Sequence, residues 1–335
     1  MKKEKEHKKI SIHTILPLAL LSIILIFLII GITKLAIWNK GIKSITPLEN
    51  VTSSPTEDSE DYFVYFTPEE FSQMHADYED DGELNIVVIG DESIQDTADQ
   101  TGIVQLMSSG IKDATIYNLC FPGSQITPKY NPFDNTYTND IVSLYWLSVC
   151  IAGDNYDFQT SFWDQIEIAD ETATKSLETM QSLDFSTVDL CIFNYNAKEY
   201  LSGQEIESID REDFSKYANA IYQSIQLLES AYPNMQFIVA SPTYCLIEKD
   251  GAFLGSEITN SGHGFLPTYM IAAKNVTTEI GVSYMDNFLG VLINKDTYPT
   301  YLKEDGFTLN MEGRALIANR YIDLINPIKN ETTEP

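Results

Sequence analysis

The sequence predicts an α/β domain built on a doubly wound, five-stranded parallel sheet with helices on both faces, preceded by an N-terminal transmembrane helix. Two observations predict the sheet. Short apolar runs alternate with segments of helical periodicity, and most of these runs are continuously apolar, which is typical of parallel strands covered on both faces. A third observation, an uncharged segment of about 20 residues near the N-terminus, predicts the membrane helix.

The N-terminal segment has the properties of a membrane anchor. Residues 14–33 carry no charged side chain, and the stretch between Ile15 and Ile32 is almost wholly aliphatic. Lysines dominate the residues before it, so the positive-inside rule predicts that residues 1–13 are cytoplasmic, that residues 14–37 span the membrane and that the remainder lies outside the cell. A cleaved signal peptide is the alternative. However, the following TKLAIWNKGIK resembles an interfacial anchor more than a small-residue cleavage site.

Residues 38–60 are polar and rich in Ser, Thr, Pro and acidic residues, and we expect a linker that holds a folded domain of residues 61–330 away from the membrane. Residues 1–43 contain eight of the 21 basic and two of the 49 acidic residues, which leaves 13 basic against 47 acidic residues and a net charge of about −34 for the rest. Such a domain repels phosphate backbones, so nucleic acid is not expected as a partner.

The alternation of elements continues through the whole domain. The expected strands are Leu84–Ile89, Ala114–Leu119, Val188–Tyr195, Gln236–Ala240 and Val282–Met285. The expected helices are Thr101–Ser109, Asn139–Ala152, Asp164–Leu183, Phe214–Tyr232, Pro267–Ile280 and Met311–Ile325. Ligands of doubly wound sheets bind beyond the carboxyl ends of the strands. Polar residues follow four of these ends, at 90–92, 118–124, 194–198 and 241–243.

The four cysteines predict neither a metal site nor a redox site. They lie in apolar surroundings and lack the CxxC spacing, so we expect buried single thiols; they are Cys120, Cys150, Cys191 and Cys245. A disulfide among them is the alternative, with no pairing predicted. No two histidines of the domain lie at metal-ligand spacing either. We therefore expect no metal and no cofactor.

The four strand ends, together with YLKEDGFTLNMEGRALIANRYI near the C-terminus, resemble the SGNH/GDSL hydrolase family over about residues 84–325. The resemblance implies the flavodoxin-like arrangement of SGNH hydrolases, and ester chemistry on substrates such as acetylated envelope polysaccharide. In that family, Gly-Asp-Ser after the first strand carries the nucleophile. A glycine and an asparagine after the next two strands complete the oxyanion hole, and Asp-x-x-His before the last helix supplies the base and its orienting carboxylate.

The first two blocks of the resemblance are only partly kept. Asp91 matches the aspartate of Gly-Asp-Ser, but Glu92 occupies the position of the nucleophilic serine. The stretch YNLCFPGS resembles the second block, with Gly123 as the oxyanion-hole glycine. A glutamate at the nucleophile position would attack a carbonyl only to form an anhydride, and its charge would repel a developing oxyanion.

The third and last blocks depart further from the family. The third block of the family reads Tyr-Gly-x-Asn-Asp-Tyr. Matching FNYNAKEYLSG to it places Asn196 at the glycine of this block, Lys198 at its asparagine and Glu199 at its aspartate. In DGFT, Asp305 keeps the orienting carboxylate, but Thr308 stands where the base belongs. A threonine hydroxyl is not a base near neutral pH, and the loss of one member of a catalytic triad removes several powers of ten in rate.

Several alternatives stay open at this point. Ser93 is an alternative nucleophile, although a turn or N-cap hydroxyl is the plainer role for a serine here. His263, in a loop after the fourth strand, is a candidate for a relocated base. Glu92 and Asp305 invite comparison with the carboxylate pair of a glycosidase. Lys198 is expected either to pair with one of these carboxylates or to face solvent.

The aromatic stretch PKYNPFDNTY, residues 128–137, follows the second strand. It is suited to stacking on sugar rings, and equally to forming a small core under a long loop.

The sequence therefore favours a membrane-anchored, extracytoplasmic protein with an SGNH/GDSL-hydrolase-like domain that is impaired in ester hydrolysis and binds an envelope polysaccharide or a partner protein. The alternative is an active carbohydrate O-acyl esterase or acyltransferase with a rearranged triad that uses Ser93. Whether the protein is an enzyme is left open by the pattern alone.

Overall fold

The structure is a computed structural model that describes residues 63–64, 83–249 and 251–332. All of the described residues belong to a single compact unit. The expected cytoplasmic segment 1–13, membrane anchor 14–37 and linker 38–60 lie outside the described residues. Within the described ranges, no helix combines the length and the apolar character that a membrane crossing requires.

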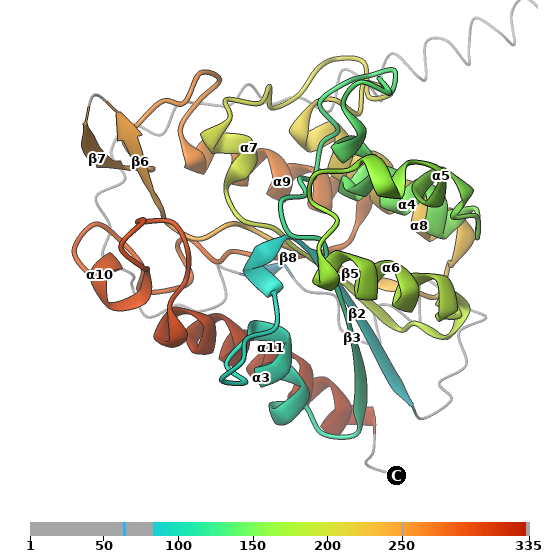
Figure 1. Cartoon of the computed structure of the whole chain (residues 1–335). Helices are drawn as coiled ribbons and strands as arrows, with labels where there is room; N and C mark the ends of the chain where they lie inside the picture. The colour runs from blue at the N-terminus through green and yellow to red at the C-terminus, as the bar shows by residue number, and fades with distance from the viewer. Residues whose placement is uncertain (1–62, 65–82, 250, 333–335) are drawn as a thin grey trace, which may run out of the picture. The chain divides into compact units, whose positions relative to one another are not determined.

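A parallel sheet forms the centre of the domain (Figure 1). Its strands are β2 (Leu84–Gly90), β3 (Ala114–Cys120), β4 (Leu190–Asn194), β5 (Gln236–Ala240) and β8 (Ser283–Met285). They lie side by side in the order β3-β2-β4-β5-β8, which in chain order is the flavodoxin-like 2-1-3-4-5. A short strand β1 (Phe63–Val64) extends the sheet beyond β8 in the antiparallel sense.

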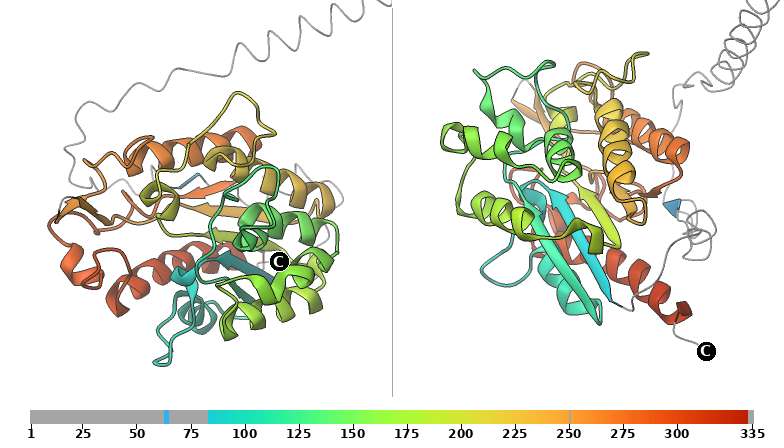
Figure 2. Two further views of the ribbon diagram at one scale, coloured as in Figure 1. Left: turned by 45° about the horizontal axis from the view of Figure 1, so that its top comes forward. Right: turned by 90° about the vertical axis from the view of Figure 1, so that its right-hand side faces the viewer.

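Helices cover both faces of the sheet, as two further views make clear (Figure 2). One face carries α3 (Ile103–Gly110) and α11 (Met311–Thr332), which pack on each other. The other face carries α6 (Glu171–Ser182), α8 (Tyr217–Ala231) and α9 (Leu266–Ile280), with α4 (Leu144–Ala152) against α8. The shorter helices are α5 (Asp157–Phe162), α7 (Lys198–Leu201) and α10 (Tyr298–Tyr301).

Strand β2 is the central element of this sandwich. Ile86, Val87, Val88 and Ile89 are completely buried, which explains why the run is continuously apolar rather than alternating. At the end of the strand, Gly90 is in register with Cys120 of β3 and with Asn194 of β4. Strands β3, β2 and β4 therefore end side by side, and the residues that follow them meet above this edge of the sheet.

The predicted α/β architecture and all five parallel strands are confirmed, each strand to within two residues of its expected bounds. The predicted helix 164–183 was too long. A 3-10 turn, η4 (Trp163–Gln165), comes first, and α6 begins only where Asp170 caps it by accepting a hydrogen bond of 2.8 Å from the N–H of Ala173. The predicted helix 139–152 is interrupted, because Ser143 is extended between η3 (Thr138–Val142) and α4.

Some elements were not predicted at all. They are α5, α7, α10 and the hairpin of β6 (Leu246–Lys249) and β7 (Ala252–Gly255), which lies outside the main sheet. All are four to six residues long. Such short segments carry too few residues to establish a period of 2 or 3.6.

Gly90 gives a direct test of how closely β2 and β4 approach each other. A Cβ atom there would lie 2.1 Å from the carbonyl oxygen of Asn194, a backbone atom that cannot rotate away. We expect Gly90→Ala to lower the free energy of unfolding by about 2 kcal/mol, measured by urea denaturation. Gly153→Ala is the control, because a Cβ there comes no closer than 3.3 Å to its neighbours. Equal stability of the two variants would contradict the close approach.

Candidate functional site at the carboxyl ends of the central strands

Asp91 links the ends of β2 and β4. Its carboxylate accepts hydrogen bonds from the N–H of Ser93 (2.9 Å), which starts the 3-10 turn η2 (Glu92–Ile94), and from the N–H of Asn196 (3.0 Å) beyond β4. Asp91 is buried. Burial, followed by the neighbouring carboxylate of Glu92, raises the pKa of Asp91 to about 6. This residue therefore holds the turn in place, and does so without facing solvent.

The side chain of Glu92 reaches across to the segments that follow β3 and β4. Its Oε2 accepts a hydrogen bond of 2.9 Å from the N–H of Gly123 and forms an ion pair of 2.5 Å with Nζ of Lys198. Its Oε1 accepts a hydrogen bond of 3.0 Å from Nδ2 of Asn196. One carboxylate thus receives a backbone N–H, an amide and an ammonium group. Gly123 and Lys198 stand at the positions matched to the oxyanion-hole glycine and asparagine, and Asn196 is the cleft residue between them in the third block.

The electrostatics agree with this geometry. The side chains of Glu92 and Lys198 are 30% and 23% exposed, so the ion pair is only partly screened by water. Burial by itself raises the pKa of Glu92, but the ammonium of Lys198 and the N–H of Gly123 outweigh it, and the net pKa is lowered. Glu92 is therefore a stable anion at neutral pH. Of the two alternatives left open for Lys198, pairing with a carboxylate or facing solvent, the structure shows pairing, with Glu92 as the partner.

A second carboxyl group, Glu199, lies in the protein interior next to these residues. It is buried and accepts hydrogen bonds from the N–H groups of Ile126 and Thr127, which fixes the chain beyond Gly123. Burial raises the pKa of Glu199 to about 7, although these hydrogen bonds lower it. It therefore acts as a support for the loop rather than as a solvent-facing catalytic group.

Ser93 points away from the carboxylate of Glu92. Its hydroxyl donates to the carbonyl oxygen of Asn194 (3.3 Å) and accepts from Nδ2 of the same residue (3.0 Å). The hydroxyl of Tyr321 on α11 in turn donates to Oδ1 of Asn194 (2.8 Å). The Ser93 side chain thus takes part in a structural network between η2, β4 and α11, and its hydrogen bonding to Asp91 also partly offsets the rise in the pKa of that carboxyl.

Asp305 and Thr308 satisfy each other. Thr308 donates from Oγ1 to Oδ2 of Asp305 (2.6 Å), while the N–H groups of Phe307 and Thr308 bind Oδ1 (2.9 and 2.8 Å). Burial raises the pKa of Asp305, but these bonds outweigh it and the net pKa is lowered. A glycosidase needs one carboxylic acid that keeps its proton. Since the pKa values of Glu92 and Asp305 are both lowered, this pair does not suit that role.

Other candidates contribute no reactive group. His263 is exposed in its loop, and no hydrogen bond among the described residues joins it to Ser93 or Thr308. All four cysteines are free and buried, as expected. Burial and then the carboxylates of Asp91 and Glu92 raise the pKa of Cys120, which opposes a thiolate. No group of potential metal ligands occurs in the described part of the chain.

Sequence reasoning missed two members of the network, Asn194 and Tyr321. Both lie inside stretches that carry the resemblance, but it assigns neither a role, since Asn194 ends an apolar strand and Tyr321 lies on the buried side of the last helix. Asn118 belongs to the second block of the resemblance, but the sequence predicted no role for its side chain. In the structure, Nδ2 of Asn118 donates to the carbonyl oxygen of Ile94 (3.0 Å) and to Asp96 (2.9 Å), which holds the end of η2.

No protein-family model and no curated protein matches the chain. Solved structures do. One crystal structure matches with a TM-score of 0.51 at 13% identity, over 72% of this chain and 95% of its own. A possible lipase from Chitinophaga pinensis matches with a TM-score of 0.45 at 14% identity, over 73% of this chain and 99% of its own. A protein described as a GDSL-like lipase from Parabacteroides merdae reaches 0.41 at 14%, over 73% and 96%.

At these identities the likeness concerns the fold alone. The doubly wound α/β fold predicted from the sequence is confirmed by the observed strand order, and one solved structure shares the fold with a TM-score of 0.51. Neither the activity of this chain nor the roles of its site residues follow from the comparison.

The raised pKa values of Asp91 and Glu199 predict a pH-dependent stability. Their ordinary values are 3.8 and 4.5, and their folded values are about 6 and about 7. A buried acid with a raised pKa binds its proton more tightly in the folded state. Its contribution is therefore complete below about pH 4 and is lost as the pH rises through 6 to 7.

We expect the free energy of unfolding to fall by at least about 2 kcal/mol between pH 5 and pH 8, at about 1.4 kcal/mol per unit of pKa difference. The fall should be smaller in Glu199→Gln, and urea titrations at several pH values measure it. Glu178→Gln, which removes an exposed carboxyl on α6, is the control and should behave as the unaltered protein. If the free energy of unfolding did not change between pH 5 and pH 8, the pKa values of Asp91 and Glu199 would not be raised in the folded state.

The Glu92–Lys198 ion pair predicts a measurable coupling. In a double-mutant cycle with Glu92→Gln and Lys198→Met, we expect the two substitutions to couple by about 1–2 kcal/mol in the free energy of unfolding. The Lys216–Glu205 pair is the control, because its glutamate is 51% exposed, and surface pairs of this kind couple by less than about 1 kcal/mol. Additive effects at Glu92 and Lys198 would mean that the pair is not formed in solution.

Proposed function

We propose that this protein is an SGNH/GDSL-hydrolase-like domain that has little or no ester-hydrolase activity and serves as a binding module of the cell envelope. One observation carries the proposal. The carboxylate of Glu92 occupies the donors of Gly123, Asn196 and Lys198, at 2.9, 3.0 and 2.5 Å. An oxyanion hole works by offering such donors to a charge that appears in the transition state. Donors already bound to a permanent anion offer no such stabilisation.

The position of the base supports the same conclusion. An acyl transfer needs a group that takes the proton of the nucleophile. Thr308 uses its hydroxyl as a donor to Asp305, and a hydroxyl is not a base at neutral pH. The proposed domain therefore has the scaffold of an esterase with neither its nucleophile nor its base.

We further propose that residues 14–37 anchor this domain in the cell membrane as a single-pass helix, with residues 1–13 in the cytoplasm and the domain outside the cell. The uncharged segment and the lysines before it support this orientation. The acidic character of the domain supports envelope ligands, such as a polysaccharide or a partner protein, over nucleic acid.

An active esterase or acyltransferase that uses Ser93 is not favoured. The hydroxyl of Ser93 is bound to Asn194 on both its donor and its acceptor side, at 3.3 and 3.0 Å. A nucleophile activated by a base would instead donate to that base.

An esterase assay tests the proposal. We expect the full-length protein to hydrolyse p-nitrophenyl acetate and acetylated xylan no faster than buffer, because it has no activated hydroxyl and no free oxyanion donors. Ser93→Ala should give the same result. The same preparation should remain unlabelled by a fluorophosphonate probe, which reacts with activated serines.

Turnover that is lost in Ser93→Ala, or a probe adduct on any residue of this site, would overturn the proposal and establish an active esterase. The positive control is an SGNH hydrolase with an intact triad, assayed in the detergent used for the full-length protein.

A further inference from the structure

The aromatic loop of residues 128–137 has an internal anchor and an exposed part. The ring of Phe133 packs in edge contacts with Phe158 (4.9 Å between ring centroids), Phe162 (5.3 Å) and Trp146 (6.2 Å). This cluster is the small core under a long loop that the sequence suggested. It explains Phe133, but it leaves Tyr130 outside, with 39% of its surface exposed.

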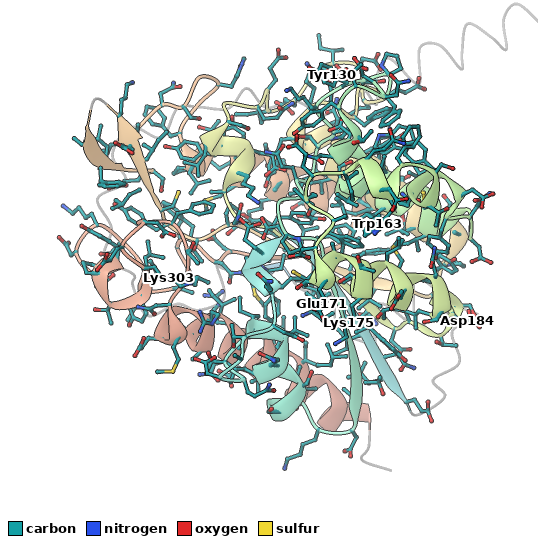
Figure 3. The ribbon with its side chains drawn as sticks, in the orientation of Figure 1. Tyr130, Trp163, Glu171, Lys175, Asp184 and Lys303 are labelled. Carbon is teal, nitrogen blue, oxygen red and sulfur yellow. The ribbon has the colours of Figure 1, made fainter. Side chains whose placement is uncertain are left out.

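Tyr130 is held in place by its backbone. The carboxylate of the buried Asp140 accepts hydrogen bonds from the N–H groups of Lys129 (2.7 Å) and Tyr130 (3.0 Å). The ring of Tyr130 meets the ring of Tyr137 edge-on at 5.9 Å. Nζ of Lys129 lies 4.4 Å from the ring centroid of Tyr137 and 5.3 Å from that of Tyr130. Figure 3 shows Tyr130 at the outer end of its loop, away from the sheet. An exposed aromatic ring on a fixed backbone loses little conformational freedom when it binds a ligand.

Beside this ring is a shallow, widely open pocket, lined by residues 130–135 and Phe162. Its wall combines aromatic and proline surface with the amides of Asn131 and Asn135 and the carboxylate of Asp134. Both hydrogen bonds of Asp134 within the loop, from the N–H and hydroxyl of Thr136, use Oδ1, so Oδ2 remains an acceptor. Ligand sites commonly have this composition, with apolar surface and a few fixed polar groups.

We propose that this pocket binds an uncharged saccharide. The C–H face of a sugar ring is weakly positive and packs on the negative face of an aromatic ring such as that of Tyr130. Amides and carboxylates bind sugar hydroxyls, because each hydroxyl both donates and accepts. The carboxylates of Asp134 and of the nearby Asp213, which accepts from Nδ2 of Asn131 at 3.4 Å, outnumber the single ammonium of Lys129 over the Tyr130 ring, so the net charge opposes anionic sugars. The pocket therefore selects neutral sugars over uronic acids and phosphorylated ones.

One continuous segment, residues 123–130, contacts Glu92 at its start and carries Tyr130 of the pocket at its end. Gly123 donates to Glu92, Ile126 and Thr127 donate to Glu199, and Lys129 and Tyr130 donate to Asp140. The inference rests on the proposed function in one respect: it names the ligand class of the proposed binding module. Its test is nevertheless independent of the esterase assay, because it measures the effect of Tyr130 on sugar binding and does not measure hydrolysis.

The test is binding of neutral oligosaccharides to the full-length protein, held in a detergent without a sugar headgroup. The probes are the β-1,4-linked tetrasaccharides of N-acetylglucosamine, glucose and xylose, with tetragalacturonate as the anionic comparison. We expect calorimetry to show saturable binding of at least one neutral probe with a dissociation constant below about 10 mM. We expect no binding of tetragalacturonate. Tyr130→Ala should weaken the binding at least tenfold, or about 1.4 kcal/mol.

Phe253→Ala is the matched control, since Phe253 is an exposed aromatic residue, 54% exposed, on the separate hairpin. It should leave the affinity unchanged. Asn135→Ala gives a second test that does not depend on the folding of the Tyr130 variant, and it should also weaken binding. The inference is wrong if no neutral probe binds, if tetragalacturonate binds as tightly, or if Tyr130→Ala and Asn135→Ala bind like the unaltered protein. Esterase turnover together with Tyr130-dependent binding would overturn the proposed function but support this inference.

Discussion

The site depends on one interaction, the contact of the Glu92 carboxylate with the donors of Gly123, Asn196 and Lys198. In an acyl-transfer enzyme, donors of this kind are catalytic because they bind the transition state more strongly than the ground state. In this protein the anion is a permanent part of the chain, so its stabilisation belongs to the folded state. The contacts of this carboxylate hold three strand ends together.

That interaction requires the register of the sheet below it. Gly90 pairs with both Cys120 and Asn194, so the chain that carries Glu92 leaves the sheet between the two chains that carry its partners. Asp91 and Glu199 then fix these chains from inside, through the N–H groups of Asn196 and Ile126. Their raised pKa values are the consequence: a carboxyl group that is buried to position backbone is more easily protonated than one in water.

Much of this arrangement could be predicted from the sequence, because continuous apolar runs identify parallel strands and the carboxyl ends of such strands share one edge. The motif positions then placed Glu92, Gly123 and Lys198 near one another, and the structure brings them together. The partner of Ser93 could not be predicted in this way. Asn194 and Tyr321 lie 127 residues apart in the chain, and their meeting depends on how α11 packs on the sheet, which no local pattern reports. The break at Ser143 was missed for a similar reason, since the N–H of Leu144 bonds to the carbonyl oxygen of Gln125 in a distant loop.

The charges at positions 92 and 198 have to be considered together. Without the lysine, the half-buried carboxylate of Glu92 would keep only the Gly123 N–H and the Asn196 amide, next to the carboxyl of Asp91. Without the glutamate, the ammonium of Lys198 would lose its ion-pair partner. As a pair they neutralise each other, and Thr308 and Asp305 satisfy one another in the same way. The residues that would carry out chemistry therefore have their hydrogen bonds within the protein. Among the groups that still face solvent is Tyr130 in the loop after β3, which presents an exposed aromatic ring beside an open pocket.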